Sequence, residues 1–222
     1  MSEPRIVAIS DFHGQLPANL PACDLLLIAG DICPLNDHTP RAQADWLATE
    51  FRPWLDRQSA THIVATWGNH DFVGELAPYM VPRLRWHMLV DETVELMGLK
   101  IYGTPWQPRF FDWAFNLDEP DLERKWARIP EGTDILIVHG PPHGYGDLAG
   151  PNQFNPTGHH TGSPSLTRRI LEVRPQLVVF GHIHEGYGVY DLENMVLANV
   201  SLLNERYEMV NRPFEGVVRV RS

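Results

Sequence analysis

Two histidines separated by one residue stand where an apolar run of the sequence stops. The run Leu177–Phe180 is followed by Gly181, and then by His182 and His184. Imidazole nitrogens act as general bases and as metal ligands, so this pair is a candidate for either chemistry. An isolated pair of this kind is more often a solvated turn. The choice therefore depends on whether other apolar runs end in the same way.

Four other apolar runs are also followed by aspartate, asparagine or histidine. Each of these groups alone is uninformative, because Asp and Asn form turns and a single histidine usually lies at the surface. Five such endings indicate one site, since the carboxyl ends of strands in an open α/β sheet meet at one ligand crevice. The runs and the residues after them are Arg5–Ser10 with Asp11 and His13, Leu25–Ala29 with Asp31, His62–Thr66 with Asn69, His70 and Asp71, and Ile135–Val138 with His139.

The donors in this set favour metal binding. Seven oxygen and nitrogen donors exceed what one tetrahedral zinc needs and suit two ions that share a carboxylate. Imidazole, carboxylate and amide without thiolate favour Mn, Fe, Zn, Ni or Co over a soft metal, and of these we expect Mn²⁺. Two such ions about 3.5–4 Å apart stabilise the attacking and leaving oxygens at phosphorus. The seven candidate ligands are Asp11, His13, Asp31, Asn69, His139, His182 and His184.

The elements that must position these residues indicate a layered α/β protein. The five apolar runs are typical of strands buried on both faces. Helices are expected from a Thr39 cap to Leu55, where Pro53 should kink or end the helix, over Asp121–Arg128, and from Ser163 to Val173. Hairpins are expected for Thr93–Leu96 with Leu99–Tyr102 and for Gly188–Tyr190 with Met195–Ala198. The Pro- and Gly-rich stretch Gly140–Pro164 is long for a connection, and such loops are often functional.

Length, charge and cysteine content narrow the class of protein. The 222 residues fit one domain, 1–222, and the formal net charge of −10 argues against bulk nucleic acid as a partner. Cys23 and Cys33 form no C-x-x-C pair, so neither a disulfide framework nor a zinc ribbon is indicated. No run approaches the roughly 18 apolar residues of a membrane span. The N-terminus lacks the pattern of a signal peptide, and a cytoplasmic location is expected.

The order D-x-H, GD, GNHD, H and GHxH between residues 11 and 184 resembles the calcineurin-like metallophosphoesterase superfamily. Any one of these motifs is weak, but the combination is highly specific. The stretches Thr104–Leu117, His139–Pro142 and Phe180–Gly188 are similar to the metallophosphoesterase-domain-containing subfamily, which includes vertebrate brain proteins and bacterial relatives regarded as phosphodiesterases. The resemblance implies a four-layer α/β/β/α sandwich with two mixed β-sheets and a metal site at the C-terminal ends of the strands.

The same resemblance implies a role for each residue of the site. One metal ion is held by Asp11, His13, Asp31 and His184, and the second by Asp31, Asn69, His139 and His182, with Asp31 bridging. His70 contacts the phosphate and protonates the leaving oxygen, and Asp71 holds the ring of His70. A hydroxide activated by both ions is the nucleophile. The implied function is a phosphodiesterase acting on a cyclic nucleotide or a small nucleotide diester.

Residues that contact the substrate are less sharply indicated by the sequence. The aromatic rings between Trp106 and Phe115 either pack beneath a loop or stack on a planar group of the substrate. His160 either contacts the substrate or lies in a solvated loop, and His143 is equally ambiguous. Asn116 and Asp147 are expected in turns, and His38, His62 and His87 in structural roles. The candidate substrate contacts are Asn69, His70, Trp106, Phe115 and His160.

Alternatives to a phosphodiesterase remain open at the level of the sequence. The same site suits a phosphomonoesterase or a nucleotide pyrophosphatase, and a metal-binding scaffold without turnover is the non-enzymatic alternative. A protein serine/threonine phosphatase is disfavoured, because the GDICPLND stretch that begins at Gly30 lacks the arginine of that class. The two hairpins and a C-terminal strand over Val217–Val220 offer an edge at which two copies could pair as a homodimer.

Overall fold

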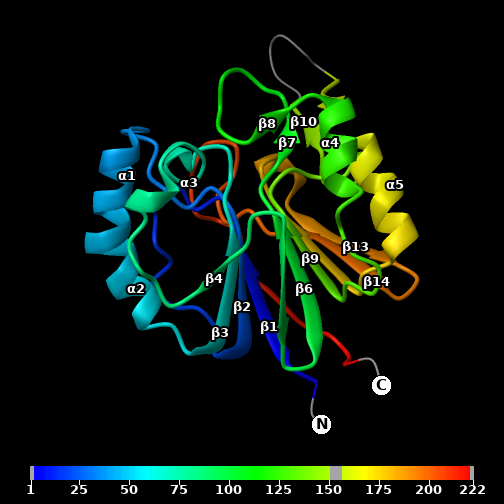
Figure 1. The fold of residues 1–222 in the computed structure, drawn as a ribbon, viewed down its shortest axis with the longest axis horizontal. Coiled ribbons are helices and arrows are strands. Elements are labelled where there is room, and N and C mark those ends of the chain that lie inside the picture. Colours follow the sequence, from blue (N-terminus) through cyan, green and yellow to red (C-terminus); the bar gives the residue numbers. More distant parts are fainter. Residues whose placement is uncertain (1–2, 151–156, 221–222) are drawn as a thin grey trace.

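The computed structural model describes residues 3–150 and 157–220. Two mixed β-sheets lie face to face, and helices cover the outer face of each sheet (Figure 1). The first sheet has the strand order β15–β1–β2–β3–β4, and the second has the order β13–β14–β12–β9–β6–β5. Four layers, α/β/β/α, result, and the prediction of two mixed sheets is confirmed.

The strands of the two sheets come from separate parts of the chain. In the first sheet they are β1 (Arg5–Ile9), β2 (Cys23–Ala29), β3 (Ala60–Thr66), β4 (His87–Met88) and β15 (Phe214–Val217). In the second they are β5 (Glu92–Leu96), β6 (Leu99–Thr104), β9 (Ile135–Val138), β12 (Leu177–Phe180), β13 (Gly188–Leu192) and β14 (Met195–Asn199). Two short ladders lie near the site, β7 (Gln107–Pro108) with β8 (Asn116–Leu117), and β10 (Leu148–Ala149) with β11 (His159–His160).

Helices flank the sandwich on both sides. The first sheet is covered by α1 (Pro40–Trp46) and α2 (Arg52–Asp56), with α3 (Phe72–Leu76) near the strand ends. The second sheet is covered by α4 (Glu119–Trp126) and α5 (Pro164–Val173). Short helical turns add Leu47–Phe51, Pro78–Met80 and His184–Gly186.

The alternation of side chains along the strands creates three apolar layers. On β2, Leu26 and Ile28 pack under the helices of the first sheet, whereas Leu25 and Leu27 face the second sheet. This follows from the period of two in a strand, in which successive side chains point to opposite faces. A third layer lies between the second sheet and α4 and α5. Continuous apolar runs are therefore required, because both faces of these strands are buried.

Two of the predicted elements differ from the structure for local reasons. The helix after Thr39 is not ended by Pro53; it widens into a π-helical turn over Leu47–Phe51 and continues as α2, with the proline in the first turn of α2. That position suits proline, which has no N–H to donate to the preceding turn. The helix predicted at Asp121–Arg128 instead spans Glu119–Trp126, because Pro120 occupies its first turn.

The predicted strand over Val217–Val220 is wrong. The last strand, β15, ends at Val217 and pairs antiparallel with β1. Val218 is buried in the layer between the two sheets, and Val220 packs against the same layer. These valines complete the core instead of forming an edge. Part of the stretch Gly140–Pro164, residues 151–156, lies outside the described residues, as do the first two and last two residues of the predicted domain.

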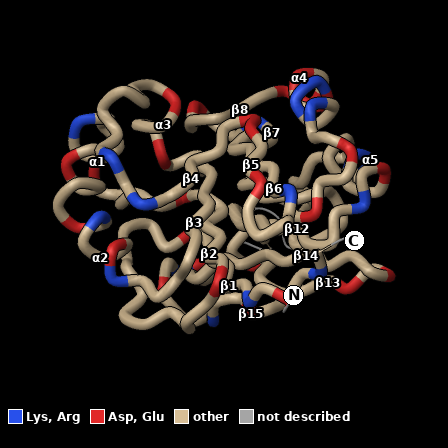
Figure 2. Tube along the Cα trace, turned by 60° about the horizontal axis from the view of Figure 1, so that its bottom comes forward, with Lys and Arg blue, Asp and Glu red and all other residues tan. Residues whose placement is uncertain are grey.

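The charges on the outer helices are mixed in sign. On α1, α2, α4 and α5 the lysines and arginines stand beside acidic residues (Figure 2). Arg41 on α1 pairs with Asp45, and Arg168 on α5 pairs with Glu123 on α4. This pattern differs from the basic stripe that a nucleic-acid duplex requires. None of the helices in the described part of the chain has the length and apolar character needed to cross a membrane.

Truncation of a residue between the two sheets should destabilise the protein strongly. Leu27 on β2 is 0% exposed, so Leu27→Ala is expected to lower the free energy of unfolding by about 2–5 kcal/mol. Leu171→Ala on α5 serves as the control. That leucine is 48% exposed, so this variant should lose little free energy of unfolding. Urea denaturation of both variants measures the difference. Equal losses would contradict the assignment of Leu27 to the core.

Candidate metal centre

The residues that follow the five predicted strands converge at one end of the sandwich. Ligand atoms of Asp11, His13 and His184 lie within 4.8 Å of one another, and so do those of Asp31, His139 and His182. The parallel bridge between Ser10 and Ser201 joins the two sheets at this end. All seven predicted metal ligands are therefore brought together, from strands of both sheets.

The carboxylate of Asp31 stands between two groups of donors. Its Oδ2 is 3.6 Å from Nε2 of His13, and its Oδ1 is 3.5 Å from Nε2 of His139. Beyond His139, Oδ1 of Asn69 lies 2.8 Å from that same Nε2 and 2.8 Å from Nδ1 of His182. The Asp31 side chain is 3% exposed. Each oxygen of this buried carboxylate faces a different set of donors.

The second group of donors lies on the His13 side of Asp31. Nε2 of His184 is 3.3 Å from Nε2 of His13 and 3.4 Å from Oδ1 of Asp11. Asp11 is fixed from behind, since its carboxylate accepts hydrogen bonds from the His182 backbone N–H and, at 2.9 Å, from the Ser201 hydroxyl. Ser201 follows β14 and was missed in the sequence, although the apolar run Met195–Ala198 also ends in polar residues.

The backbone is strained where it delivers these side chains. Asp11, His13, Asp31 and His182 have φ angles of 51°, 42°, 52° and 68°, in the left-handed region that non-glycine residues rarely adopt. Such conformations cost about 1–3 kcal/mol each and persist where surrounding structure imposes them, often at functional sites. Gly181 is required for a different reason, because a Cβ there would collide with the Asp11 carboxylate and the Ser10 hydroxyl.

Hydrogen bonds outside the centre orient two of the imidazoles. Nδ1 of His139 lies 2.9 Å from the Ala29 carbonyl, and Nδ1 of His184 lies 2.9 Å from the Asn204 carbonyl. A carbonyl only accepts, so each Nδ1 carries a proton, and Nε2 is the ring atom that faces the centre. This arrangement is typical of metal-bound histidines.

The charges of the centre are unbalanced without a cation. Burial, together with the charges of Asp11 and Asp71, raises the pKa of Asp31 well above its usual range. Burial opposes protonation of His184, but its hydrogen bond to Asp11 prevails and raises the pKa to about 9. Burial and the neighbouring His139 lower the pKa of His182 to about 3, which keeps that imidazole neutral. The raised pKa values of Asp31 and His184 thus show that the centre lacks positive charge, and the donor set fits divalent metal ions.

Comparison with known proteins agrees with this geometry. Residues 4–186 match the calcineurin-like phosphoesterase family. The chain belongs to this family. Metallophosphoesterase domain-containing protein 1 of Homo sapiens is 34% identical to it over 94% of this chain and 69% of its own length. The resemblance found in the sequence motifs is confirmed, and the family is one of phosphoester hydrolases.

Solved structures of low sequence identity share the fold of this calcineurin-like phosphoesterase. TT1561 of Thermus thermophilus matches with a TM-score of 0.57 and 15% identity, over 98% of this chain and 100% of its own. Phosphopantetheinyl hydrolase of Mycobacterium tuberculosis matches with a TM-score of 0.55 and 14% identity, over 92% of this chain and 91% of its own. Both likenesses extend across the two sheets, well beyond the metal centre.

His70 has a different partner from the one expected of this phosphoesterase. Its Nδ1 lies 3.3 Å from Nε2 of His38, and its ring packs 4.2 Å from Trp113. Burial and the neighbouring His38 lower the pKa of His70 to about 3, so the imidazole is neutral at pH 7. The prediction that His38 is purely structural is therefore incomplete, since it contacts the candidate catalytic histidine.

The interpretation that Asp71 holds the ring of His70 is wrong. The Asp71 carboxylate is fully buried and accepts hydrogen bonds from the backbone N–H groups of Cys33 and Gly68, both at 2.8 Å, and of Ile32 at 3.0 Å. It thereby ties the turn after β3 to the turn after β2. Gln43 on α1 supports the same turn, because its amide donates to the His70 carbonyl and accepts from the Val73 N–H. A buried glutamine gives no signal of this role in the sequence.

A cavity of about 610 Å³ opens onto the centre. Its lining includes His13, Asp31, Asn69, His70, His182 and His184, the aromatic rings of Phe110, Phe111, Trp113 and Tyr207, and His160. Tyr207, missed in the sequence, packs its ring 5.3 Å from that of His13 and 5.1 Å from that of His184. Of the predicted substrate contacts, the structure therefore places Asn69, His70 and His160 at the cavity.

Trp106 and Phe115 are absent from the lining of this cavity. Phe115 is 2% exposed and packs in the core, with its ring 5.5 Å from that of Trp106. The Trp106 indole donates to Asp91, and Lys125 stands 3.9 Å above its ring. The prediction that these two rings contact substrate is wrong, because Phe115 is buried in the core and Trp106, partly buried, contacts Asp91 and Lys125 instead. Asn116 holds the loop as expected, donating to the carbonyls of Phe110 and Phe111.

Metal uptake should release protons. At pH 7.5 the metal-free centre holds a proton on His184, whose pKa is about 9, and the raised pKa of Asp31 favours a second. A divalent cation displaces such protons, so we expect a net release of about one proton or more per chain. The number of protons that His184 releases on metal binding should decrease as the pH rises through about 9, because above that pH His184 has already lost its proton. Titration calorimetry with Mn²⁺ in buffers of different ionisation enthalpy measures this. Binding heats that do not depend on the buffer would contradict it.

Proposed function

We propose that this chain is a dinuclear-metal phosphodiesterase. The observation that carries the proposal is the Asp31 carboxylate, whose two oxygens face two separate groups of donors. One ion would take Asp11, His13, Asp31 and His184, and the other Asp31, Asn69, His139 and His182, with Mn²⁺ as the first choice. When bound, two such ions supply Lewis-acid stabilisation of phosphoryl oxygens and lower the pKa of an attacking water.

His70 would contact the leaving oxygen of the substrate, and His38 would fix the tautomer of His70. In the tautomer that we propose, Nε2 of His38 donates to Nδ1 of the neutral His70, 3.3 Å away, and His70 carries its own proton on Nε2. That Nε2–H would donate a hydrogen bond to the leaving oxygen of the substrate, and the proton itself would come from water. The His70 ring is held at the edge of the centre by contact with Trp113. Its backbone N–H donates a hydrogen bond of 2.8 Å to Oδ1 of Asp31.

The cavity suits a substrate with a planar group beside its phosphate. Phe110 and Phe111 are 55% and 73% exposed, and both line the cavity together with Trp113. Exposed rings of this kind stack on nucleobases, each stacked base contributing about 1–3 kcal/mol. We therefore favour a cyclic nucleotide or a small nucleotide diester as substrate, with the base on this aromatic wall and the phosphate at the centre.

Two substitutions should separate the role of Asp31 from that of His70. Asp31→Asn is expected to abolish hydrolysis and to lower the metal content, because it removes the carboxylate shared by both ions. His70→Ala should lower kcat about 100- to 1,000-fold and keep both metals, as expected for loss of a hydrogen bond that stabilises charge on the leaving oxygen. Metal analysis and turnover are measured together, with His87→Ala on β4 as an exposed control. A metal-depleted His70→Ala protein would refute the role given to His70.

A comparison of two synthetic substrates tests the diesterase activity. The purified protein with Mn²⁺ should hydrolyse bis-p-nitrophenyl phosphate with a higher kcat/KM than p-nitrophenyl phosphate. Faster turnover of the monoester would favour a phosphomonoesterase on the same centre. Two bound metals without turnover of either ester, or of ATP as a pyrophosphate substrate, would favour a metal-binding scaffold. Trp113→Ala should raise KM for a nucleotide diester more than for a diester without an aromatic ring, since only the former has a planar group to stack on the indole.

A further inference from the structure

Outside the seven donors of the centre, three other side chains converge on a second point. His143, in the turn that follows β9, and His160, on β11, both direct Nδ1 toward the carboxylate of Asp147. The distances are 3.4 Å from His143 to Oδ2 and 2.7 Å from His160 to Oδ1, and the two imidazole rings lie 5.2 Å apart. Ligand atoms of the three residues lie within 4.8 Å of one another.

The backbone holds this cluster in place. Asp147 is 1% exposed, and its Oδ2 accepts a hydrogen bond of 3.1 Å from the Gly162 N–H. The Asp147 carbonyl accepts from the Thr161 N–H, and the His143 N–H donates to the Ser163 carbonyl. The segments that carry the three side chains are thus already joined. Asp147, expected from the sequence as a turn residue, is the buried centre of this cluster.

Two imidazoles and one carboxylate form a recognised ligand set for zinc. Sites with three protein ligands of these types keep a fourth position open for water or another ligand. Zinc bonds of about 2.0–2.2 Å in a tetrahedron place neighbouring ligand atoms about 3.3 Å apart. The contact between His143 and Oδ2 of Asp147 already has this spacing. His160 contacts the other oxygen, Oδ1, at 2.7 Å, so its ring would have to move by a few tenths of an ångström or more to share an ion with Oδ2.

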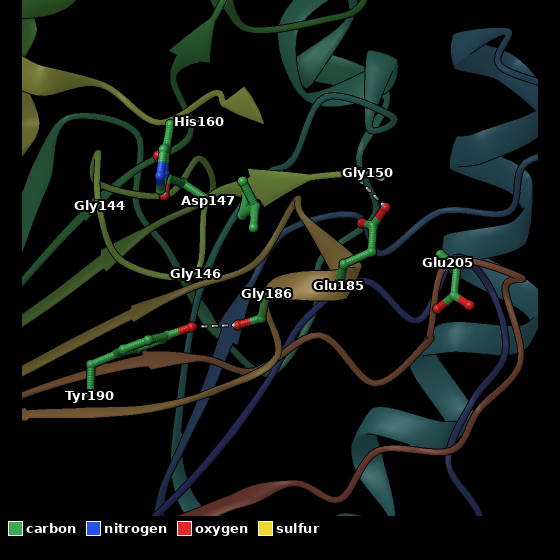
Figure 3. Close-up of a pocket in the computed structure, with 10 residues that line it drawn as sticks. Gly144, Gly146, Asp147, Gly150, His160, Glu185, Gly186, Tyr190 and Glu205 are labelled. Atoms are coloured by element: carbon green, nitrogen blue, oxygen red, sulfur yellow. Dashed lines mark hydrogen bonds and ion pairs between the residues drawn. The ribbon is translucent and has the colours of Figure 1, made fainter. Parts of the chain in front are cut away.

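The surroundings of the cluster favour a cation over an anion. Asp147 and His160 line a cavity of about 650 Å³ that also carries the carboxylates of Glu185 and Glu205 (Figure 3). Among the lining residues that the structure describes there is no lysine or arginine. A cleft lined by one sign of charge concentrates ions of the opposite sign. Entry is open, because the side chains of His143 and His160 are 47% and 51% exposed.

We propose that His143, Asp147 and His160 bind one divalent transition-metal ion of the zinc class, with the open coordination position toward this cavity. The site uses none of the seven donors around Asp31, so it does not depend on the proposed phosphodiesterase activity. His160 also lines the cavity above the metal centre, so the ion would add positive charge to the rim where an anionic substrate enters.

Counting zinc tests the site. Wild type, His143→Gln and His87→Gln are equilibrated with Zn²⁺, freed of excess by gel filtration and analysed for metal. His143→Gln should bind one ion fewer than wild type, and His87→Gln, which alters an exposed histidine on β4, should bind as many as wild type. The difference of one ion is expected whatever the count at the Asp31 centre. Equal zinc contents of wild type and His143→Gln, or an equal loss in His87→Gln, would overturn the proposal.

A second measurement isolates the site from the main centre. In an Asp31→Asn background loaded with Co²⁺, visible absorption of a tetrahedral His/carboxylate complex should persist, and added Asp147→Asn should abolish it. If no metal binds there, protons on the Nδ1 atoms of His143 and His160 make the same contacts with Asp147. In that case, adding Asp147→Asn would leave the visible absorption of the Asp31→Asn protein unchanged, and the proposal would be wrong. Turnover of bis-p-nitrophenyl phosphate by His143→Gln with saturating Mn²⁺ should stay within about twofold of wild type. Loss of that activity together with unchanged zinc content would assign His143 to the substrate instead.

Discussion

The architecture of the site depends on one carboxylate held away from water between two groups of candidate metal ligands. Asp31 follows β2, the central strand of the first sheet, whereas His139 and His182 follow strands of the second. A buried carboxylate among other carboxylates is unfavourable unless positive charge balances it. The centre therefore makes folding, protonation and metal binding parts of one equilibrium. Strained turns at Asp11, His13, Asp31 and His182 are imposed by the sheets packed behind them.

Much of this organisation can be predicted from the sequence, because burial on both faces leaves an unmistakable pattern. Runs such as Leu177–Phe180 must be continuously apolar when a sheet lies on one side and helices on the other. Their ends are equally informative, since a parallel arrangement brings them to one edge. The seven donors could thus be named before the structure, although the grouping around Asp31 and the second sheet required the family resemblance.

The remaining features depend on tertiary contacts that local patterns do not encode. Asp71 follows His70 in the chain but turns toward backbone N–H groups of Ile32, Cys33 and Gly68, and His38, which is remote in the sequence, takes its expected place. Phe115 and Trp113 are two residues apart in one aromatic segment, yet one is core and the other lines the cavity. The loop backbone decides which ring faces the cavity, and the loop sequence has no repeating pattern from which this could be predicted.

Anomalous diffraction tests most directly whether two metal ions share the Asp31 carboxylate. Crystals grown with Mn²⁺ and measured at the manganese absorption edge would locate each ion independently of activity. For a dinuclear centre we expect two peaks about 3.5–4 Å apart at the ends of the strands, with the Asp31 carboxylate in contact with both. A single peak there, or two peaks of which only one contacts Asp31, would contradict a dinuclear centre bridged by Asp31.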